Sequence, residues 1–240
     1  MITPRHSKYH VREMSMEAAD PFTTESPKSY LDINRAAYDA LADEYRDRRK
    51  LDREKDLLLI QPFIDLLREH FAGGPIHVLD LGCGNGLNLG MFADEGFQVT
   101  GIDISPRMLD VARDTCPTAT LLAADFLAYP FDFRSFDGVF AKASIHLFPH
   151  ADAVRLLQKV SDVLRLNGVF YVTTTVEQTS GEGLRKKSDY NHAVARYRRS
   201  WSEQELLDAV ASAGFQIVKS GYNSEVSRGK RWFNVWASKL

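Results

Sequence analysis

The residues best suited to chemistry form a glycine-rich turn, Gly82-Cys83-Gly84-Asn85-Gly86. An apolar run precedes this turn, and a pattern typical of an amphipathic helix begins near Leu87. Glycines allow the backbone to approach a nucleotide-like ligand closely, and the start of the helix favours negative charge beside it. Asp80 lies just before the turn and would repel a pyrophosphate, whereas it would attract a sulfonium ligand that also carries an ammonium group.

Acidic residues also occur where the next predicted strands end. Asp103 ends the second strand and can accept hydrogen bonds from both hydroxyls of a ribose. Asp125 and Phe126 follow the third strand and could offer a carboxylate to an adenine amino group and an aromatic face to its ring. Residues 141–146 follow the fourth strand. Because ligands of open α/β sheets bind outside the carboxyl ends of the strands, we expect these positions to meet at one site.

The elements that position these residues alternate between strand and helix. This alternation predicts an α/β fold with a doubly wound, mostly parallel sheet of seven strands. The last two strands have no helix between them, so we expect a C-terminal hairpin that makes one strand antiparallel. Strands are expected at 76–81, 97–102, 119–123, 136–141, 169–175, 215–220 and 232–238, and helices at 87–95, 106–114, 152–166 and 202–213.

Local signals define several helix ends. Ser105 is the expected cap of a helix whose first residue is proline, and Ser202 with Glu205 forms a capping box. Asn167-Gly168 is expected to close the helix over 152–166.

Two features separate the glycine turn from the dinucleotide-binding pattern of dehydrogenases. The third glycine, Gly86, comes one residue early, and Asp80 argues against pyrophosphate. Over residues 76–240 the sequence instead resembles the class I, Rossmann-like S-adenosylmethionine (SAM) methyltransferases of small molecules and natural products. The resemblance implies SAM as cofactor and S-adenosylhomocysteine (SAH) as product. It also implies that Asp80 holds the methionine end, Asp103 the ribose and Asp125 the adenine amine.

Phe126 or Met108 would cover the adenine faces, although either could equally be a core residue. Asp103 could also serve only as a capping acid, and Asp125 only as a solvated loop acid. Cys83 is expected to be a small filler of the turn rather than a nucleophile. The full set expected at the cofactor is Asp80, Gly82, Cys83, Gly84, Asn85, Asn88, Asp103, Ile104, Met108, Asp125, Phe126 and Ala141, with Tyr30, Tyr38 and Arg49 from upstream helices.

Upstream of the core at 73–240, the sequence predicts two parts. Residues 1–28 are polar, contain three prolines and are expected to form a flexible arm. Residues 29–72 are expected to form two amphipathic helices, over 29–49 and 57–71.

The run from Tyr38 to Tyr45 is similar to the lid helix of many small-molecule methyltransferases, in which a tyrosine or arginine closes over the cofactor. The alternative for each candidate is simple packing of an amphipathic helix. The lid candidates are Tyr30, Tyr38, Tyr45 and Arg49.

Methyl transfer from sulfur is an in-line displacement, so the protein mainly aligns the reactants, excludes water and removes a proton from a neutral acceptor. His146 is the candidate base, with a structural hydrogen-bonding role as the alternative. His192 and Tyr190 are weaker candidates in a polar insertion, 176–201, that is expected to cover the substrate. Tyr38 is a further weak candidate. Neither a metal site nor a covalent nucleophile is evident.

Composition limits the partners. The net charge of −2 and the pI of about 6.4 disfavour a global attraction to nucleic acid or to an anionic membrane. No apolar run approaches the roughly 20 residues that span a bilayer. Two cysteines favour a reducing, cytoplasmic setting. The N-terminal arm leaves a homodimer open without requiring one.

Three functions therefore remain in view. The first is a SAM-dependent methyltransferase of a small molecule, with an N, O or C acceptor. The second is an RNA methyltransferase acting on a modified tRNA base, disfavoured by the charge and by the lack of a recognisable RNA-binding module. The third is a SAM-binding protein without turnover, because a cofactor motif reports binding rather than chemistry.

Overall fold

The fold was analysed in a computed structural model that describes residues 29–187, 190, 193–225 and 230–240. The predicted flexible arm at 1–28 and His192 lie outside the described residues.

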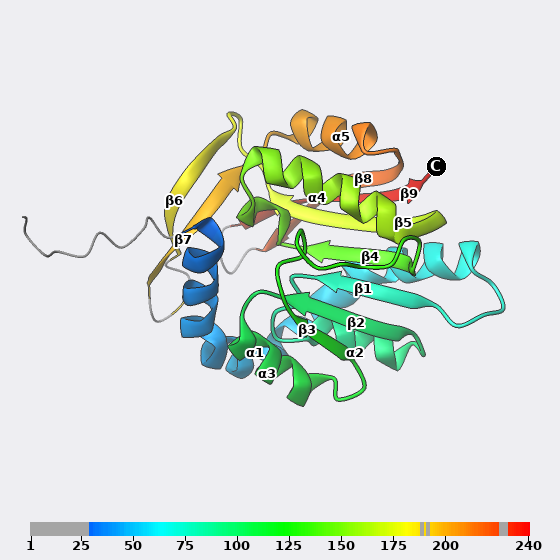
Figure 1. The fold of residues 1–240 in the computed structure, drawn as a ribbon, viewed down its shortest axis with the longest axis horizontal. Coiled ribbons are helices and arrows are strands. Elements are labelled where there is room, and N and C mark those ends of the chain that lie inside the picture. Colours follow the sequence, from blue (N-terminus) through cyan, green and yellow to red (C-terminus); the bar gives the residue numbers. More distant parts are fainter. Residues whose placement is uncertain (1–28, 188–189, 191–192, 226–229) are drawn as a thin grey trace, which may run out of the picture.

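The main sheet has seven strands in the order β3-β2-β1-β4-β5-β9-β8 (Figure 1). Strand β9 runs antiparallel to both of its neighbours, whereas β1 to β5 pair in parallel. The predicted doubly wound sheet with a C-terminal hairpin is therefore confirmed. The strands are β1 His77–Leu81, β2 Gln98–Asp103, β3 Thr120–Ala123, β4 Phe136–Lys142, β5 Leu164–Thr175, β8 Phe215–Glu225 and β9 Lys230–Lys239.

Helices cover both faces of this sheet, because side chains alternate along each buried strand. In β4, Val139 and Ala141 pack with α4 and α5, whereas Phe140 faces the end of α1 and α2. Phe63 of α1 lies 5.5 Å from the ring of Phe92 and 5.3 Å from that of Phe140. The helices are α1 Tyr30–His70, α2 Leu87–Asp94, α3 Pro106–Thr115, the short 3-10 helix η1 Ile145–Leu147, α4 His150–Val163 and α5 Glu203–Ser212.

The prediction of two N-terminal helices is wrong, because α1 is one helix of 41 residues. Residues 50–56 are charged except for Leu51 and include neither glycine nor proline, so nothing in the sequence stops the first helix there. Figure 1 shows the first part of α1 beside strand β7 (Val194–Ser200) and its last part running across one face of the main sheet. One helix thus contributes to both the core and the edge of the sheet where β1, β2 and β4 end.

The predicted helix over 152–166 is also wrong at its end. Helix α4 ends at Val163, and Leu164 already pairs with Phe136 in the sheet. The Leu164 side chain is fully buried in the core, and this burial favours the strand over another helical turn. Asn167 has a φ of 62°, so it makes the tight irregularity inside β5 instead of closing a helix.

The insertion at 176–201 contains an antiparallel hairpin of β6 Gly181–Lys187 and β7 Val194–Ser200, which the sequence did not predict. Its strands are rich in arginine and lysine and lack the apolar alternation of an ordinary strand. Figure 1 shows the hairpin at the carboxyl edge of the main sheet, beside the first part of α1. The sequence analysis expected an insertion over this edge but not the hairpin within it.

Gly86→Ala is expected to lower the free energy of unfolding by about 2–4 kcal/mol. Gly86 has a φ of 74°, and a Cβ there would lie 2.8 Å from the Cα of Ala112. Gly96→Ala is the matched control, because Gly96 has a φ of 84° but a Cβ would meet no atom within 4 Å. Urea unfolding of both variants measures the difference. Equal losses would show that contact with α3 does not restrict this turn.

Candidate functional site

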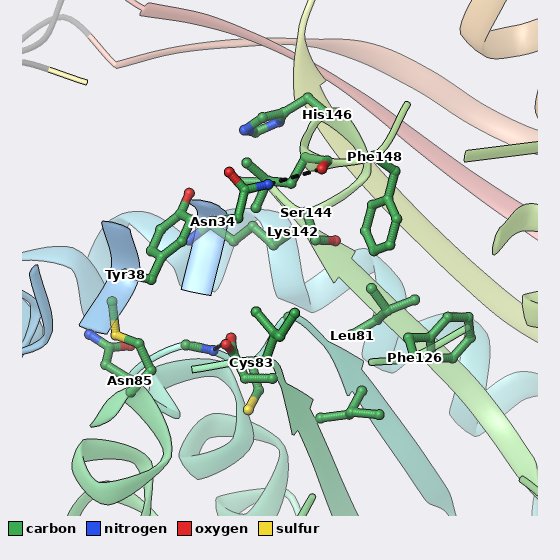
Figure 2. Close-up of a pocket in the computed structure, with 18 of the residues that line it drawn as sticks. Asn34, Tyr38, Leu81, Cys83, Asn85, Phe126, Lys142, Ser144, His146 and Phe148 are labelled. Atoms are coloured by element: carbon green, nitrogen blue, oxygen red, sulfur yellow. Dashed lines mark hydrogen bonds between the residues drawn. The ribbon is translucent and has the colours of Figure 1, made fainter. Parts of the chain in front are cut away.

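A cavity of about 470 Å³ lies at the carboxyl ends of β1, β2 and β4, beneath α1 and the β6–β7 hairpin. Figure 2 shows Cys83 and Leu81 on one side of it and His146 on the opposite side. Most of the residues singled out in the sequence line this cavity: Tyr30, Tyr38, Gly82, Cys83, Gly84, Asn85, Asn88, Asp103, Ile104, Met108, Asp125, Phe126 and His146.

For four other predicted residues the structure does not show a position on the cavity wall. Asp80 and Ala141 are buried in β1 and β4 and are not among the residues that line the cavity. The side chain of Arg49 lies outside the described part of the molecule, as does all of His192. Direct contacts of these residues with a ligand therefore stay predictions.

The glycine turn exposes its backbone to the cavity. The N–H groups of Gly82 and Cys83 both donate to the carbonyl of Ile102, at 2.8 and 3.1 Å, which fixes the turn against β2. Gly84 has a φ of 51°, and a Cβ on it would meet no atom within 4 Å. The space beside its backbone is therefore open to a ligand.

Cys83 fills space within the fold. A Cβ on Gly101 of β2 would lie 2.8 Å from its sulfur, so the two residues are packed closely. Burial raises the pKa of the Cys83 thiol well above its usual value, and the nearby charges of Asp103 and Asp80 raise it further. The thiol is accordingly held in its neutral form and has the character of a packing group.

The Asp103 carboxylate is held by backbone donors at the end of β2. One oxygen accepts from the Gly84 N–H at 2.9 Å and the other from the Ser105 N–H at 2.9 Å. Burial raises the pKa of this carboxyl above its usual value, and the backbone hydrogen bonds counteract that effect. The Ile104 N–H is a third backbone donor to this carboxyl. Because a carboxylate has about four acceptor sites, the group can still accept a hydroxyl from the cavity.

Helix α1 is hydrogen-bonded to the glycine turn and to the start of α3. Asn85 donates to the carbonyl of Tyr45 at 3.1 Å, and Asp39 accepts from the hydroxyl of Ser105, the cap of α3. These contacts hold the first part of α1 against the glycine turn and the start of α3.

His146 faces the cavity from η1. Its Nδ1 lies 3.1 Å from the hydroxyl of Thr174, and that hydroxyl lies 3.3 Å from the Thr175 carbonyl. Because a carbonyl can only accept, the Thr174 hydroxyl donates to it and accepts from the N–H at Nδ1. This arrangement favours the tautomer of His146 that carries its lone pair on Nε2, the form a proton acceptor needs.

Aromatic residues and cations form the side of the cavity made by α1 and the hairpin. Tyr45 stacks on Tyr190, with ring centroids 4.8 Å apart. Lys187 lies 4.3 Å above the Tyr190 ring, and Arg196 donates to the Tyr38 hydroxyl at 2.7 Å.

Sequence reasoning missed several lining residues: Asn34, Lys142, Ser144, Thr173, Lys187, Asn223 and Trp232. Lys142 ends β4 and Ser144 follows it, and both lie in the segment 141–146 already singled out in the sequence, so that position could have signalled them. Asn223 and Trp232 lie on the C-terminal hairpin, and no local motif marks them.

Asn34 of α1 joins three elements. Its amide donates to the Leu147 carbonyl at 3.1 Å, and its oxygen accepts from the Tyr197 N–H at 2.9 Å. Figure 2 shows this side chain between Tyr38 and Phe148 at the cavity. The contacts tie α1 to both η1 and the hairpin.

Asn34→Leu is expected to lower the free energy of unfolding by about 2–4 kcal/mol, because it leaves a carbonyl and an N–H without these partners. Gln61→Leu is the matched control, since the Gln61 amide is exposed on the same helix and donates to Asp65 one turn away. Urea unfolding compares the two. A loss no larger than that of the control would contradict the bridging role.

Within the described ranges, no group of three or more metal-ligating side chains occurs. In the same residues, no helix is both long and apolar enough to cross a membrane.

Comparison with known proteins places this site in a family. Residues 78–168, which include the glycine turn and His146, match a family model described as a methyltransferase domain. The 18S rRNA (guanine-N(7))-methyltransferase bud23 of Schizosaccharomyces pombe is 32% identical over 168 residues, which are 68% of this chain and 58% of that protein. The 1,6-didemethyltoxoflavin-N1-methyltransferase of Burkholderia thailandensis has the same fold, with a TM-score of 0.66, 21% identity and coverage of 90% of this chain and 93% of that one.

The chain thus contains a methyltransferase domain, and its fold is that of the class I, Rossmann-like SAM-dependent methyltransferases. A further relative, the sterol 4-C-methyltransferase strm-1 of Caenorhabditis elegans, is 26% identical over 66% of this chain and 50% of that protein. The chain thus spans little more than half of these curated relatives. These relatives are named for acceptors as different as ribosomal RNA and a sterol, so the methyltransferase domain alone leaves the acceptor open.

Proposed function

We propose that this chain transfers a methyl group from SAM to a small-molecule acceptor. The observation that carries the proposal is that one cavity is lined both by the glycine turn with Asp103 and Asp125 and by His146. A cofactor and an acceptor can therefore lie side by side in it, and such alignment supplies roughly 7–11 kcal/mol toward a displacement reaction.

The described residues fit SAM. The open backbone at Gly84 suits close approach of the cofactor, and Asp103 has acceptor capacity for a ribose. In this proposal Asp125 binds the adenine amine, Phe126 and Met108 flank its ring, and the remaining predicted contacts complete the site. When bound, SAM supplies an electrophilic methyl group on its sulfonium.

The other residues close and complete the acceptor side. The first part of α1, with Tyr30 and Tyr38, and the hairpin act as a lid that excludes water. His146 accepts the proton of a neutral acceptor at Nε2. Neither role requires a covalent nucleophile, and Cys83 is held as a packing group.

A thermal shift assay tests the cofactor assignment. SAM and SAH are expected to raise the melting temperature, since ligand at about 100 times its Kd stabilises a protein by about 2.7 kcal/mol. NAD is the matched control, because it tests the dinucleotide alternative. A shift with NAD and none with SAM would refute the assignment.

RNA is the second candidate acceptor, because the curated relative bud23 is named for ribosomal RNA. The net charge of −2 disfavours an extended phosphate contact. Binding of bulk ribosomal RNA and tRNA at rising salt separates the two acceptors. Strongly salt-sensitive binding would favour RNA, and no binding would remove it.

A further inference from the structure

The charged residues that line the cavity are separated by sign. The described carboxylates of the lining, Asp103 and Asp125, follow β2 and β3 at one end of the sheet. The described cations come from elsewhere: Lys142 ends β4, and Lys187 and Arg196 lie on the hairpin. If the carboxylates hold the adenosine part of SAM, as the proposed function requires, the cations are left for the acceptor.

Arg196 is the best placed of these cations. Its Nη1 donates to the neutral Tyr38 hydroxyl at 2.7 Å, and its Nε is buried without a hydrogen-bond partner among the described residues. A buried guanidinium N–H without an acceptor is costly, so the geometry favours an additional acceptor here.

Other positively charged side chains lie near Arg196. Burial lowers the pKa of the neighbouring Arg198, and the charge of Arg196 lowers it further. Glu177 lies 3.7 Å from Arg198 and partly offsets that charge, but it is not among the residues that line the cavity. Figure 2 shows Lys142 between Ser144 and Tyr38, the residue whose hydroxyl accepts from Arg196.

We infer that the acceptor carries an anionic oxygen group, such as a carboxylate or phenolate, which Arg196, Lys142 and Lys187 bind inside the cavity. This inference rests on the proposed function and specifies its substrate class. Tyr190, whose ring lies against Lys187, and Trp232, whose ring lies near that of His146, also line the cavity and suit a planar organic anion. The recessed cations fit a small anion better than a flipped nucleobase, which is neutral.

Benzoate and benzamide provide a matched pair of probes that differ in charge. Each is titrated into the full-length protein with and without saturating SAH, at constant ionic strength, and binding is followed by calorimetry. Benzoate is expected to bind at least about tenfold more tightly than benzamide, because charge-assisted hydrogen bonds are the strong ones. Arg196→Gln and Lys142→Met are each expected to remove that preference while leaving the affinity for SAH within about threefold.

Arg113→Gln is the control variant, because Arg113 is exposed on α3, pairs with Asp110 and does not line the cavity. Equal binding of the two probes, or a benzoate preference that survives in both cavity variants, would overturn the inference. Displacement of benzoate by bulk RNA would assign the cations to phosphates and would also overturn it. Absence of SAH binding would count against the proposed function instead, because the benzoate comparison is also made without SAH.

Discussion

Asp103→Asn is expected to weaken SAM binding about 100-fold or more, because the hydrogen bonds to the ribose hydroxyls lose the negative charge of the carboxylate. Asp103 accepts from the N–H groups of Gly84 and Ser105 on its two oxygens. The asparagine side chain has only one oxygen, so its NH₂ group would face one of those donors. The change thus removes both the charge offered to a ribose and one support of the glycine turn.

Isothermal calorimetry of SAM measures this effect, and the melting temperature without ligand reports any loosening of the turn. Asp110→Asn is the matched control, because Asp110 is an exposed acid that pairs with Arg113 on α3. If Asp103→Asn binds SAM within threefold of the unmodified protein, Asp103 is a capping acid and not a cofactor contact.

His146→Ala is expected to lower kcat about 10²–10⁴-fold with a neutral accepting atom, the range for loss of a general base. The affinity for SAM should remain nearly unchanged, because His146 lies on the side of the cavity opposite the glycine turn. Single-turnover methyl transfer measures the rate, and calorimetry measures SAM binding. Equal losses in both would contradict an acceptor-side role.

Thr174 provides a second test of the same role. Its buried hydroxyl accepts from His146 Nδ1, so we regard it as a positioning residue. Thr174→Val should lower kcat, and Thr174→Ser should restore it because the hydroxyl returns. If valine and serine give the same rate, the hydrogen bond does not control the histidine.

The main features of the fold were predictable because they follow from local patterns. Strands and helices alternate as expected. Ser202 forms the predicted capping box, and Ser105 caps the helix that begins at Pro106. Two boundaries were not predictable locally. Helix α1 continues through 50–56 because no residue there stops it. Helix α4 ends before the predicted residue 166 because Leu164 pairs with Phe136 in the sheet.

The two halves of the cavity differ in the same way. The cofactor half follows from short motifs, since Gly82, Asp103 and Asp125 each lie at or just after the end of a strand. The acceptor half is assembled from distant segments, with Trp232 on the last strand and Arg196 on a hairpin whose charged sequence gives no strand signal. Only tertiary contacts bring these side chains together, so sequence reasoning identified the cofactor more fully than the acceptor.

The central claim is that this cavity transfers methyl groups from SAM to small molecules. The most direct measurement incubates the protein with SAM carrying a tritiated methyl group, a small-molecule extract and total RNA, then counts label in each fraction. The account predicts label in the small-molecule fraction, lost in His146→Ala. Label in RNA alone, or SAM binding without any transfer, would contradict it.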